Sequence, residues 1–346
     1  MRAAVLTQLG SPLEIMEGIS VPELSAGQVL VKLAYSGVCH SQVMEVNGAR
    51  GPDRWLPHML GHEATGRVVS IGSSVTKVST GDLVVLGWIK GQGCEAGGCQ
   101  YLRDGITINA GGVTTFSDHA VVSENRVVKL PQGVPLDLGV LFGCALPTGA
   151  GMVLNEVKPE AGSSVVVFGL GGIGLSAFLA ARTFAVNLIA VDVSSSKLEL
   201  ALRLGADHII DAHRSSPVCR IQEITGDGAD YCIECSGQSS VIQQAFLASD
   251  PSKGLTIFAS HPPAGEFIHI DPHHLIAGRK IQGSWGGGSN PDRDVPLMAD
   301  LWKSGNFPIE ELISKKRYGL NEINVALNDL AQGSVLRPVI EINANV

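Results

Sequence analysis

Apolar runs alternate with Ala- and Leu-rich stretches through the second half of the chain. The apolar runs predict strands at 164–168, 187–191, 208–211, 231–235, 255–259 and 280–284. Residues 175–185 and 194–204 predict helices, and the second opens with serines that can cap it. Strand–helix–strand repetition predicts a parallel, doubly wound sheet.

The first part of the chain has a different pattern. Short β segments at 28–35, 65–71 and 82–86 are cut by Gly and Pro, without a long helical period, and 335–342 predicts a final strand. We therefore expect a β-rich, barrel-like domain formed by residues 1–146 and 287–346. An α/β nucleotide-binding domain, 147–286, is inserted into it.

Composition narrows the class of protein. The 346 residues are 45% hydrophobic and 17% charged, which excludes a disordered chain. A net charge of -8 argues against nucleic acid or an anionic membrane as the main partner. No signal peptide or membrane-spanning run is evident, and seven cysteines, an odd number, argue against a disulfide framework. We expect a cytoplasmic protein.

A glycine motif follows the strand at 164–168. FGLGGIG contains Gly169, Gly171, Gly172 and Gly174, and Asp192 ends the next strand 18 residues after Gly174. Glycines allow a tight turn and close approach of a pyrophosphate, while the acid accepts hydrogen bonds from ribose hydroxyls and repels a 2′-phosphate. This predicts NAD rather than NADP; the alternative is an ordinary strand–helix turn with a surface Asp.

Three candidate metal ligands lie beside glycines near the ends of strand-like runs. They are Cys39 in SGVCHS, His62 in GHEATG and Cys144 in FGCALPTG. Two thiolates and an imidazole suit zinc and leave a fourth position open for catalysis. Spacing alone leaves the alternative open that these are two buried cysteines and an unrelated histidine.

Several segments carry a resemblance to a known family. The chain resembles zinc-dependent, medium-chain alcohol dehydrogenases in the segments GVCHS, GHEATGRVVSIGSSVTKVSTGD, GCALPTGAG, VFGLGGIG and VDVSSSKL, which occur in family order. The resemblance covers nearly the whole chain. It implies a GroES-like β-rich catalytic domain and a Rossmann domain, with zinc and NAD as cofactors.

The resemblance also implies roles for individual residues. Cys39, His62 and Cys144 match the catalytic zinc ligands, and Glu63 matches a carboxylate close to the zinc. Ser41 matches the hydroxyl that takes the substrate proton. The remaining matches are Thr148 at the nicotinamide, Lys197 near the adenosine, Arg337 and His40 at the pyrophosphate, and Trp88 and Ala110 in the substrate pocket.

The chain departs from the family pattern in two places. The four-cysteine lobe that holds a structural zinc is missing, since only Cys94 and Cys99 remain near it. We expect one catalytic zinc per chain, and a loop at 87–112 held by turns and packing. In the proton relay, Met44 stands where many members have a histidine, and Gln42 replaces an acid that often orients the zinc-bound histidine.

These expectations favour an oxidoreductase that transfers hydride between an alcohol and NAD, as a homodimer or homotetramer. The alcohol is primary, secondary or polyol-type. A zinc-free, NADPH-dependent quinone or enone reductase on the same fold is the main alternative. Such a protein would lack the cysteine and histidine ligands and would prefer a basic or small residue at Asp192. A non-enzymatic role on this fold is a third alternative.

Overall fold

The computed structural model describes residues 1–346, which divide into two compact units. Unit 1 comprises Met1–Cys144, Asn290–Asp300 and Glu310–Val346, and unit 2 comprises Ala145–Ser289 and Leu301–Ile309. The chain thus leaves unit 1 after Cys144 and returns to it near its C-terminus.

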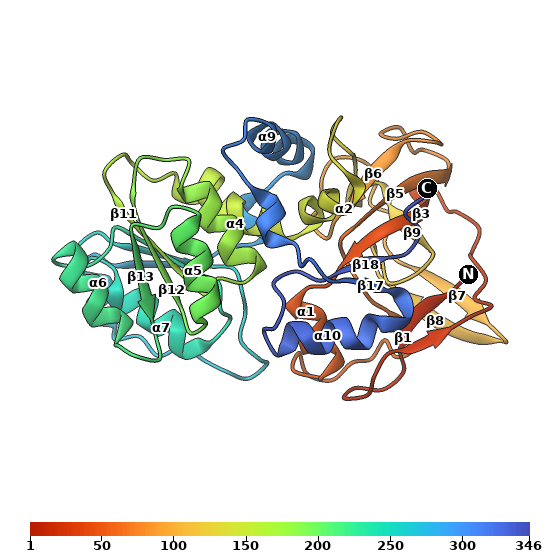
Figure 1. The fold of residues 1–346 in the computed structure, drawn as a ribbon. Coiled ribbons are helices and arrows are strands. Elements are labelled where there is room, and N and C mark those ends of the chain that lie inside the picture. Colours follow the sequence, from red (N-terminus) through yellow and green to blue (C-terminus); the bar gives the residue numbers. More distant parts are fainter. The chain divides into compact units, whose positions relative to one another are not determined.

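Unit 2 contains a six-stranded parallel sheet in the order β13-β12-β11-β14-β15-β16 (Figure 1). The strands are β11 (Ser164–Phe168), β12 (Asn187–Asp192), β13 (His208–Asp211), β14 (Tyr231–Glu234), β15 (Leu255–Phe258) and β16 (Lys280–Gly283). The strand order reverses at β11, which pairs with β12 on one side and β14 on the other. Parallel sheets of this kind bind ligands at the carboxyl ends of the strands flanking such a reversal.

Helices connect these strands. They are α4 (Gly172–Ala181), α5 (Ser195–Arg203), α6 (Pro217–Thr225), α7 (Ser239–Ala248) and α8 (Pro272–Ala277), and a further helix, α3 (Ala145–Gly151), precedes β11. The helix predicted at 175–185 begins earlier, because Gly171 is already its N-cap, and it ends at Ala181. The first helical turn after β11 therefore lies inside the glycine motif.

Unit 1 contains two sheets. One has the order β10-β6-β5-β3-β18-β17, with β9 also paired to β3, and the other has the order β2-β1-β4-β8-β7. The strands are β1 (Ala3–Leu6), β2 (Glu14–Met16), β3 (Gln28–Gly37), β4 (His58–Met59), β5 (Ala64–Ile71), β6 (Leu83–Leu86), β7 (Cys99–Arg103), β8 (Ile106–Ala110), β9 (His119–Ser123), β10 (Val127–Lys129), β17 (Arg317–Gly319) and β18 (Val339–Glu341). The final strand is shorter than predicted, because Pro338 before it has no N–H for the ladder.

The segment 87–112 contains a β-hairpin, so the expectation of a loop held only by turns and packing is wrong. β7 and β8 pair in antiparallel register from Cys99 opposite Ala110 to Arg103 opposite Ile106. Asp104 and Gly105 join them, both with positive φ, at 48° and 80°. An Asp-Gly pair with this backbone matches the right-handed twist of the two strands.

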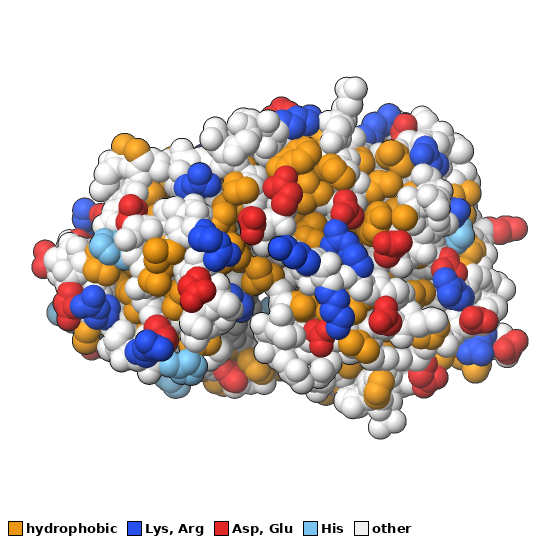
Figure 2. All heavy atoms as spheres, in the orientation of Figure 1, with side chains coloured by type: hydrophobic (Ala, Val, Ile, Leu, Met, Phe, Trp, Pro, Cys, Tyr) orange, Lys and Arg blue, Asp and Glu red, His pale blue; other side chains and the backbone are white.

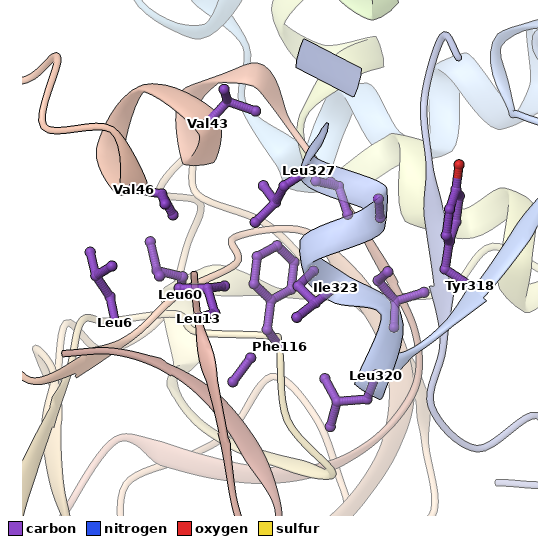
Figure 3. Packing of buried hydrophobic residues seen from close by; sticks show 14 residues of the cluster. Leu6, Leu13, Val43, Val46, Leu60, Phe116, Tyr318, Leu320, Ile323 and Leu327 are labelled. Atoms are coloured by element: carbon purple, nitrogen blue, oxygen red, sulfur yellow. The ribbon is translucent and has the colours of Figure 1, made fainter. Parts of the chain in front are cut away.

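Unit 1 also contains α1 (His40–Val46), α2 (Leu136–Gly139) and α10 (Ile323–Ala331), and α9 (Pro291–Lys303) runs from unit 1 into unit 2. An apolar cluster joins α1 to α10 (Figure 3). Val43 and Val46 of α1 meet Ile323 and Leu327 of α10, and Phe116 lies among them. Since α1 directly follows Cys39, this packing holds one end of the candidate metal site.

No single helix is long and apolar enough to cross a membrane; only the bent pair 136–143 and 145–157 meets that test, by length and composition alone. On the face drawn in Figure 2, acidic and basic side chains are interspersed.

Candidate metal centre and cofactor turn

The ligand atoms of Cys39, His62 and Cys144 lie within 4.8 Å of one another in unit 1. Cys39 precedes α1, His62 lies between β4 and β5, and Cys144 follows a 3-10 turn. Both cysteines are buried, and His62 Nε2 lies 3.3 Å from Cys144 Sγ. Three segments that are distant in sequence thus bring two sulfurs and one imidazole nitrogen to a single point.

The two sulfurs titrate as a pair. The hydrogen bond from Cys144, helped by the charge of Arg337, holds the pKa of Cys39 well below its usual value. The same hydrogen bond, with burial, raises the pKa of Cys144 well above its usual value. A metal binds the thiolate form, so a bound divalent cation would displace any proton that the two sulfurs still share.

This donor set fits zinc. Two thiolates and one imidazole are ligands that Zn²⁺ prefers, and three protein ligands leave the fourth tetrahedral position for a small molecule. A closed structural site would need a fourth side chain here, and the metal-ligating group contains only these three residues.

Gln42 connects two of the ligands. Its side-chain oxygen accepts the Cys39 N–H at 3.0 Å, and its amide nitrogen lies 2.5 Å from His62 Nδ1. A histidine that binds a metal through Nε2 carries its proton on Nδ1 and needs an acceptor there. The amide must therefore turn its oxygen toward His62 when the metal is bound.

A buried ion pair lies beside the metal ligands. Arg337 Nη2 is 2.5 Å from Glu63 Oε1, and both side chains are almost fully buried. Burial raises the pKa of Glu63, which Arg337 opposes, whereas Glu63 and the two cysteines hold the pKa of Arg337 above its usual value. Gly37 permits this arrangement, because a Cβ there would lie 2.5 Å from Glu63 Oε1.

The glycine motif of unit 2 forms a turn between β11 and α4. Gly169 has a φ of +82°, and a Cβ there would lie 2.9 Å from Ser236 N. A Cβ on Gly174 would lie 1.8 Å from the Gly169 carbonyl oxygen, whereas nothing lies within 4 Å of a Cβ on Gly171. The space at Gly171, next to the N-terminus of α4, fits a pyrophosphate.

Asp192 is held against this turn. Its Oδ2 accepts the Leu170 N–H at 2.6 Å, and its Oδ1 accepts the Ser194 N–H at 2.8 Å. A carboxylate at the end of the second strand of such a unit binds ribose hydroxyls. The turn, the open space and the acid together fit NAD.

The other predicted residues are placed differently. The hydroxyls of Ser41 and Thr148 are buried and have no hydrogen-bond partner. His40 is exposed at the start of α1, and Lys197 is half-buried on α5. Only one of the two predicted substrate-pocket residues lines the 830 Å³ cavity of unit 1: Ala110 does, and Trp88 does not.

Sequence reasoning missed a second group of possible ligands in this cavity. Glu45, Asp53 and His58 line this cavity, as does His62. The ligand atoms of Glu45, Asp53 and His58 lie within 4.8 Å of one another. Two acids and a histidine within one short polar segment were the available signal. Without the fold, nothing showed that they converge.

Comparisons with known proteins agree with this geometry. Residues 25–132 match the family model described as "Alcohol dehydrogenase GroES-like domain", and residues 172–304 match "Zinc-binding dehydrogenase". Class-3 alcohol dehydrogenase of Cereibacter sphaeroides is 32% identical over 98% of this chain and 99% of its own length. S-(hydroxymethyl)glutathione dehydrogenase of Synechocystis is 33% identical over 98% of this chain and 99% of its own.

A solved structure agrees as well. Benzyl alcohol dehydrogenase of Acinetobacter calcoaceticus superposes with a TM-score of 0.88 at 32% identity, covering 99% of both chains. The GroES-like and zinc-binding dehydrogenase models, the full-length relatives and the Cys-His-Cys group all lead to one conclusion. The chain belongs to the zinc-dependent medium-chain alcohol dehydrogenase family.

Proposed function

We propose that Cys39, His62 and Cys144 hold one catalytic zinc in an enzyme that transfers hydride between an alcohol and NAD, giving an aldehyde or ketone. The observation that carries this proposal is the convergence of the three ligand atoms within 4.8 Å. When bound, zinc supplies Lewis-acid polarisation of the alcohol oxygen, and NAD accepts the hydride.

Ser41 takes the proton of the alcohol in this proposal. Its hydroxyl is buried and has no partner within the protein, so it is available to accept a hydrogen bond from a substrate. His40, the residue before Ser41 in the chain, is exposed and passes the proton to water. Glu63 stays paired with Arg337, whose positive charge offsets the negative charges of the carboxylate and of the nearby sulfurs.

The remaining binding roles fall to the chain's cofactor residues. Gly169, Gly171, Gly172 and Gly174 form the turn that binds the pyrophosphate, with the open space at Gly171, and Asp192 selects NAD by accepting hydrogen bonds from the ribose hydroxyls. We assign Thr148 to the nicotinamide, Lys197 to the adenosine, and Arg337 with His40 to the pyrophosphate. The residues 147–286 then form the NAD-binding domain, while 1–146 and 287–346 form the catalytic domain.

The substrate is a primary, secondary or polyol-type alcohol whose distal part enters the cavity lined by Ala110. The cavity has both apolar and polar walls, since Trp55, Met59 and Val113 line it alongside Gln100 and Asn109. Relatives with full-length similarity are named for benzyl alcohol and S-(hydroxymethyl)glutathione. Both compounds therefore belong in a test panel.

The test is a panel of alcohols and aldehydes with NAD and NADP, before and after zinc removal. We expect reduced cofactor to form with an alcohol and NAD, activity to disappear on chelation, and activity to return with zinc. Reduction of a quinone or enone by NADPH without zinc, and no alcohol turnover, would contradict the proposal and favour the zinc-free reductase.

We further propose a cytoplasmic homodimer or homotetramer joined through β16. The seven cysteines are all free, which suits a reducing compartment. β16 is an edge strand of the unit 2 sheet, and Ile276 and Phe267 in the segments before it are 82% and 76% exposed. An edge strand next to exposed apolar side chains favours pairing with a second copy.

A further inference from the structure

Glu45, Asp53 and His58 form a group of three potential ligands in unit 1 that the catalytic proposal does not use. Glu45 lies on α1, Asp53 in the following loop and His58 on β4. Their ligand atoms lie within 4.8 Å of one another. His58 is only 7% exposed, so its imidazole is held within the protein and does not move freely in solvent.

The hydrogen bonds of His58 show which of its two ring nitrogens could bind a metal ion. Nδ1 lies 3.0 Å from the carbonyl oxygen of Met59. A carbonyl oxygen only accepts, so Nδ1 carries a proton. Nε2 lies 2.8 Å from Asp53 Oδ2, and because a carboxylate oxygen only accepts, a proton joins these two atoms when no ion is bound; a divalent cation would take the place of that proton. A histidine that binds a metal through Nε2 commonly donates Nδ1–H to a backbone carbonyl.

In Asp53, as in His58, one side-chain atom is held by the backbone and the other is left for a metal ion. Its Oδ1 accepts the Trp55 N–H at 2.8 Å, which leaves Oδ2 directed at His58. Two ligands at about 2.0–2.2 Å from one ion lie roughly 3 Å apart, close to the separation of Nε2 and Oδ2. The carboxylate of Glu45 completes the group, and its repulsion with Asp53 is relieved by a divalent cation more fully than by one imidazolium.

The cavity provides access and further ligands. All three residues line the same 830 Å³ space, which has room for an ion with several waters. Thr114 lines it too, and the Thr114 hydroxyl is buried without a hydrogen-bond partner. An unpartnered buried hydroxyl in the wall indicates that the cavity normally holds a polar occupant.

We infer that Glu45, Asp53 and His58 form a second, exchangeable site for a first-row divalent cation such as Mn²⁺ or Zn²⁺. One imidazole and two carboxylates, without a thiolate, suit such an ion and bind it less tightly than a Cys-His-Cys group binds zinc. Arg50 lies 3.9 Å from Glu45 and competes for its carboxylate, which also weakens the site.

Mn²⁺ binding to the zinc-containing protein tests this inference, since Mn²⁺ can be followed by electron paramagnetic resonance. We expect one Mn²⁺ per chain, with nitrogen coupling from an imidazole in pulsed spectra. Glu45→Gln and His58→Gln should each weaken binding by about tenfold or more, and His58→Gln should abolish the nitrogen coupling. His213→Gln removes an exposed histidine of unit 2 and serves as the matched control, with unchanged binding.

Glu45→Gln tests metal binding without disturbing the fold, because Glu45 is partly exposed on α1 and glutamine has the same shape. Absence of Mn²⁺ binding to the unaltered protein would overturn the inference and leave His58 and Asp53 as a hydrogen-bonded pair without a metal. Equal binding by the unaltered protein and both variants would also overturn it. Neither result affects the Cys39–His62–Cys144 assignment, because that zinc is measured separately.

Discussion

The Gln42 side chain lies 2.5 Å from His62 Nδ1. The Gln42 oxygen accepts a hydrogen bond from the Cys39 N–H. Zinc binding through Nε2 of His62 requires an acceptor for the proton on Nδ1 of the same ring. We predict that Gln42→Leu lowers zinc affinity by about 10- to 100-fold, because the acceptor is lost. Gln42→Asp, which supplies a carboxylate acceptor, should bind zinc at least as tightly as the unaltered protein.

Chelator competition measures both affinities. Unchanged zinc affinity in Gln42→Leu would show that the Nδ1 proton of His62 needs no acceptor from this side chain. A Val43→Ala variant on the same helix removes buried apolar volume without touching the hydrogen bond. It controls for a general loosening of α1.

Variants of Ser41 and Met44 distinguish a loss of proton transfer from a loss of packing in α1. Met44 cannot carry a proton, so the route proposed from Ser41 to solvent has to bypass it. We predict that Ser41→Ala lowers kcat by about 10²-fold or more, and that Met44→His is neutral or raises activity near pH 7. Steady-state kinetics measure both; a Met44→Ala variant losing as much activity as Ser41→Ala would contradict this route.

At the scale of elements, Asp192 accepts the Leu170 N–H in the β11–α4 turn, and the proposed function also gives it the choice of cofactor. We predict that Asp192→Ala raises NADP use relative to NAD, because the 2′-phosphate no longer meets a carboxylate. It should also lower stability by about 1–3 kcal/mol, since the Leu170 N–H loses its acceptor in a buried turn.

Two measurements separate these effects: the ratio of kcat/KM for the two cofactors, and the free energy of unfolding. Asp192→Asn retains a carbonyl acceptor but removes the charge, so it should change the cofactor ratio with less loss of stability. An unchanged cofactor ratio in both variants would refute the role of Asp192 in selecting NAD.

In the β7–β8 hairpin, residues 99–103 pair with residues 106–110 in antiparallel register. Burial raises the pKa of Cys99 to about 11, so its thiol is protonated at neutral pH. The hydrogen bond with Glu124 raises the pKa of Cys94. We predict one tightly held zinc per chain, unchanged in a Cys94→Ser/Cys99→Ser double variant. Metal analysis after dialysis measures the number of bound zinc ions per chain. Two tightly bound zinc ions in the unaltered protein, one of them lost in the double variant, would refute the prediction.

At the scale of the whole molecule, the exposed apolar side chains before β16 predict self-association. Phe267→Asp with Ile276→Asp should convert the oligomer to a 36.2 kDa monomer, because two charges would be buried in the interface. Light scattering after size exclusion measures the mass. Leu102→Asp, at an exposed apolar position of unit 1, is the matched control and should leave the mass unchanged. A monomeric unaltered protein would contradict the proposed interface.

The sequence by itself determined the unit 2 sheet and its cofactor turn. Val165, Val166 and Val167 are fully buried, and such a continuous apolar strand is visible without knowledge of its neighbours. The glycines from Gly169 to Gly174 and the acid at Asp192 act within one strand–turn–helix–strand segment. Local chemistry of this kind is readable because the residues that interact are close in sequence.

Only the tertiary structure decided the contacts between distant segments. The β7–β8 hairpin has just Tyr101 and Ile108 fully buried, while Leu102 and Ile106 are exposed, so its pattern gave no clear strand signal. The Glu63–Arg337 pair and the Glu45, Asp53 and His58 group likewise depend on which segments the β-sheets and helices of unit 1 bring together. A single sequence records the chemistry of each side chain, but the folding of the chain sets the distances between them.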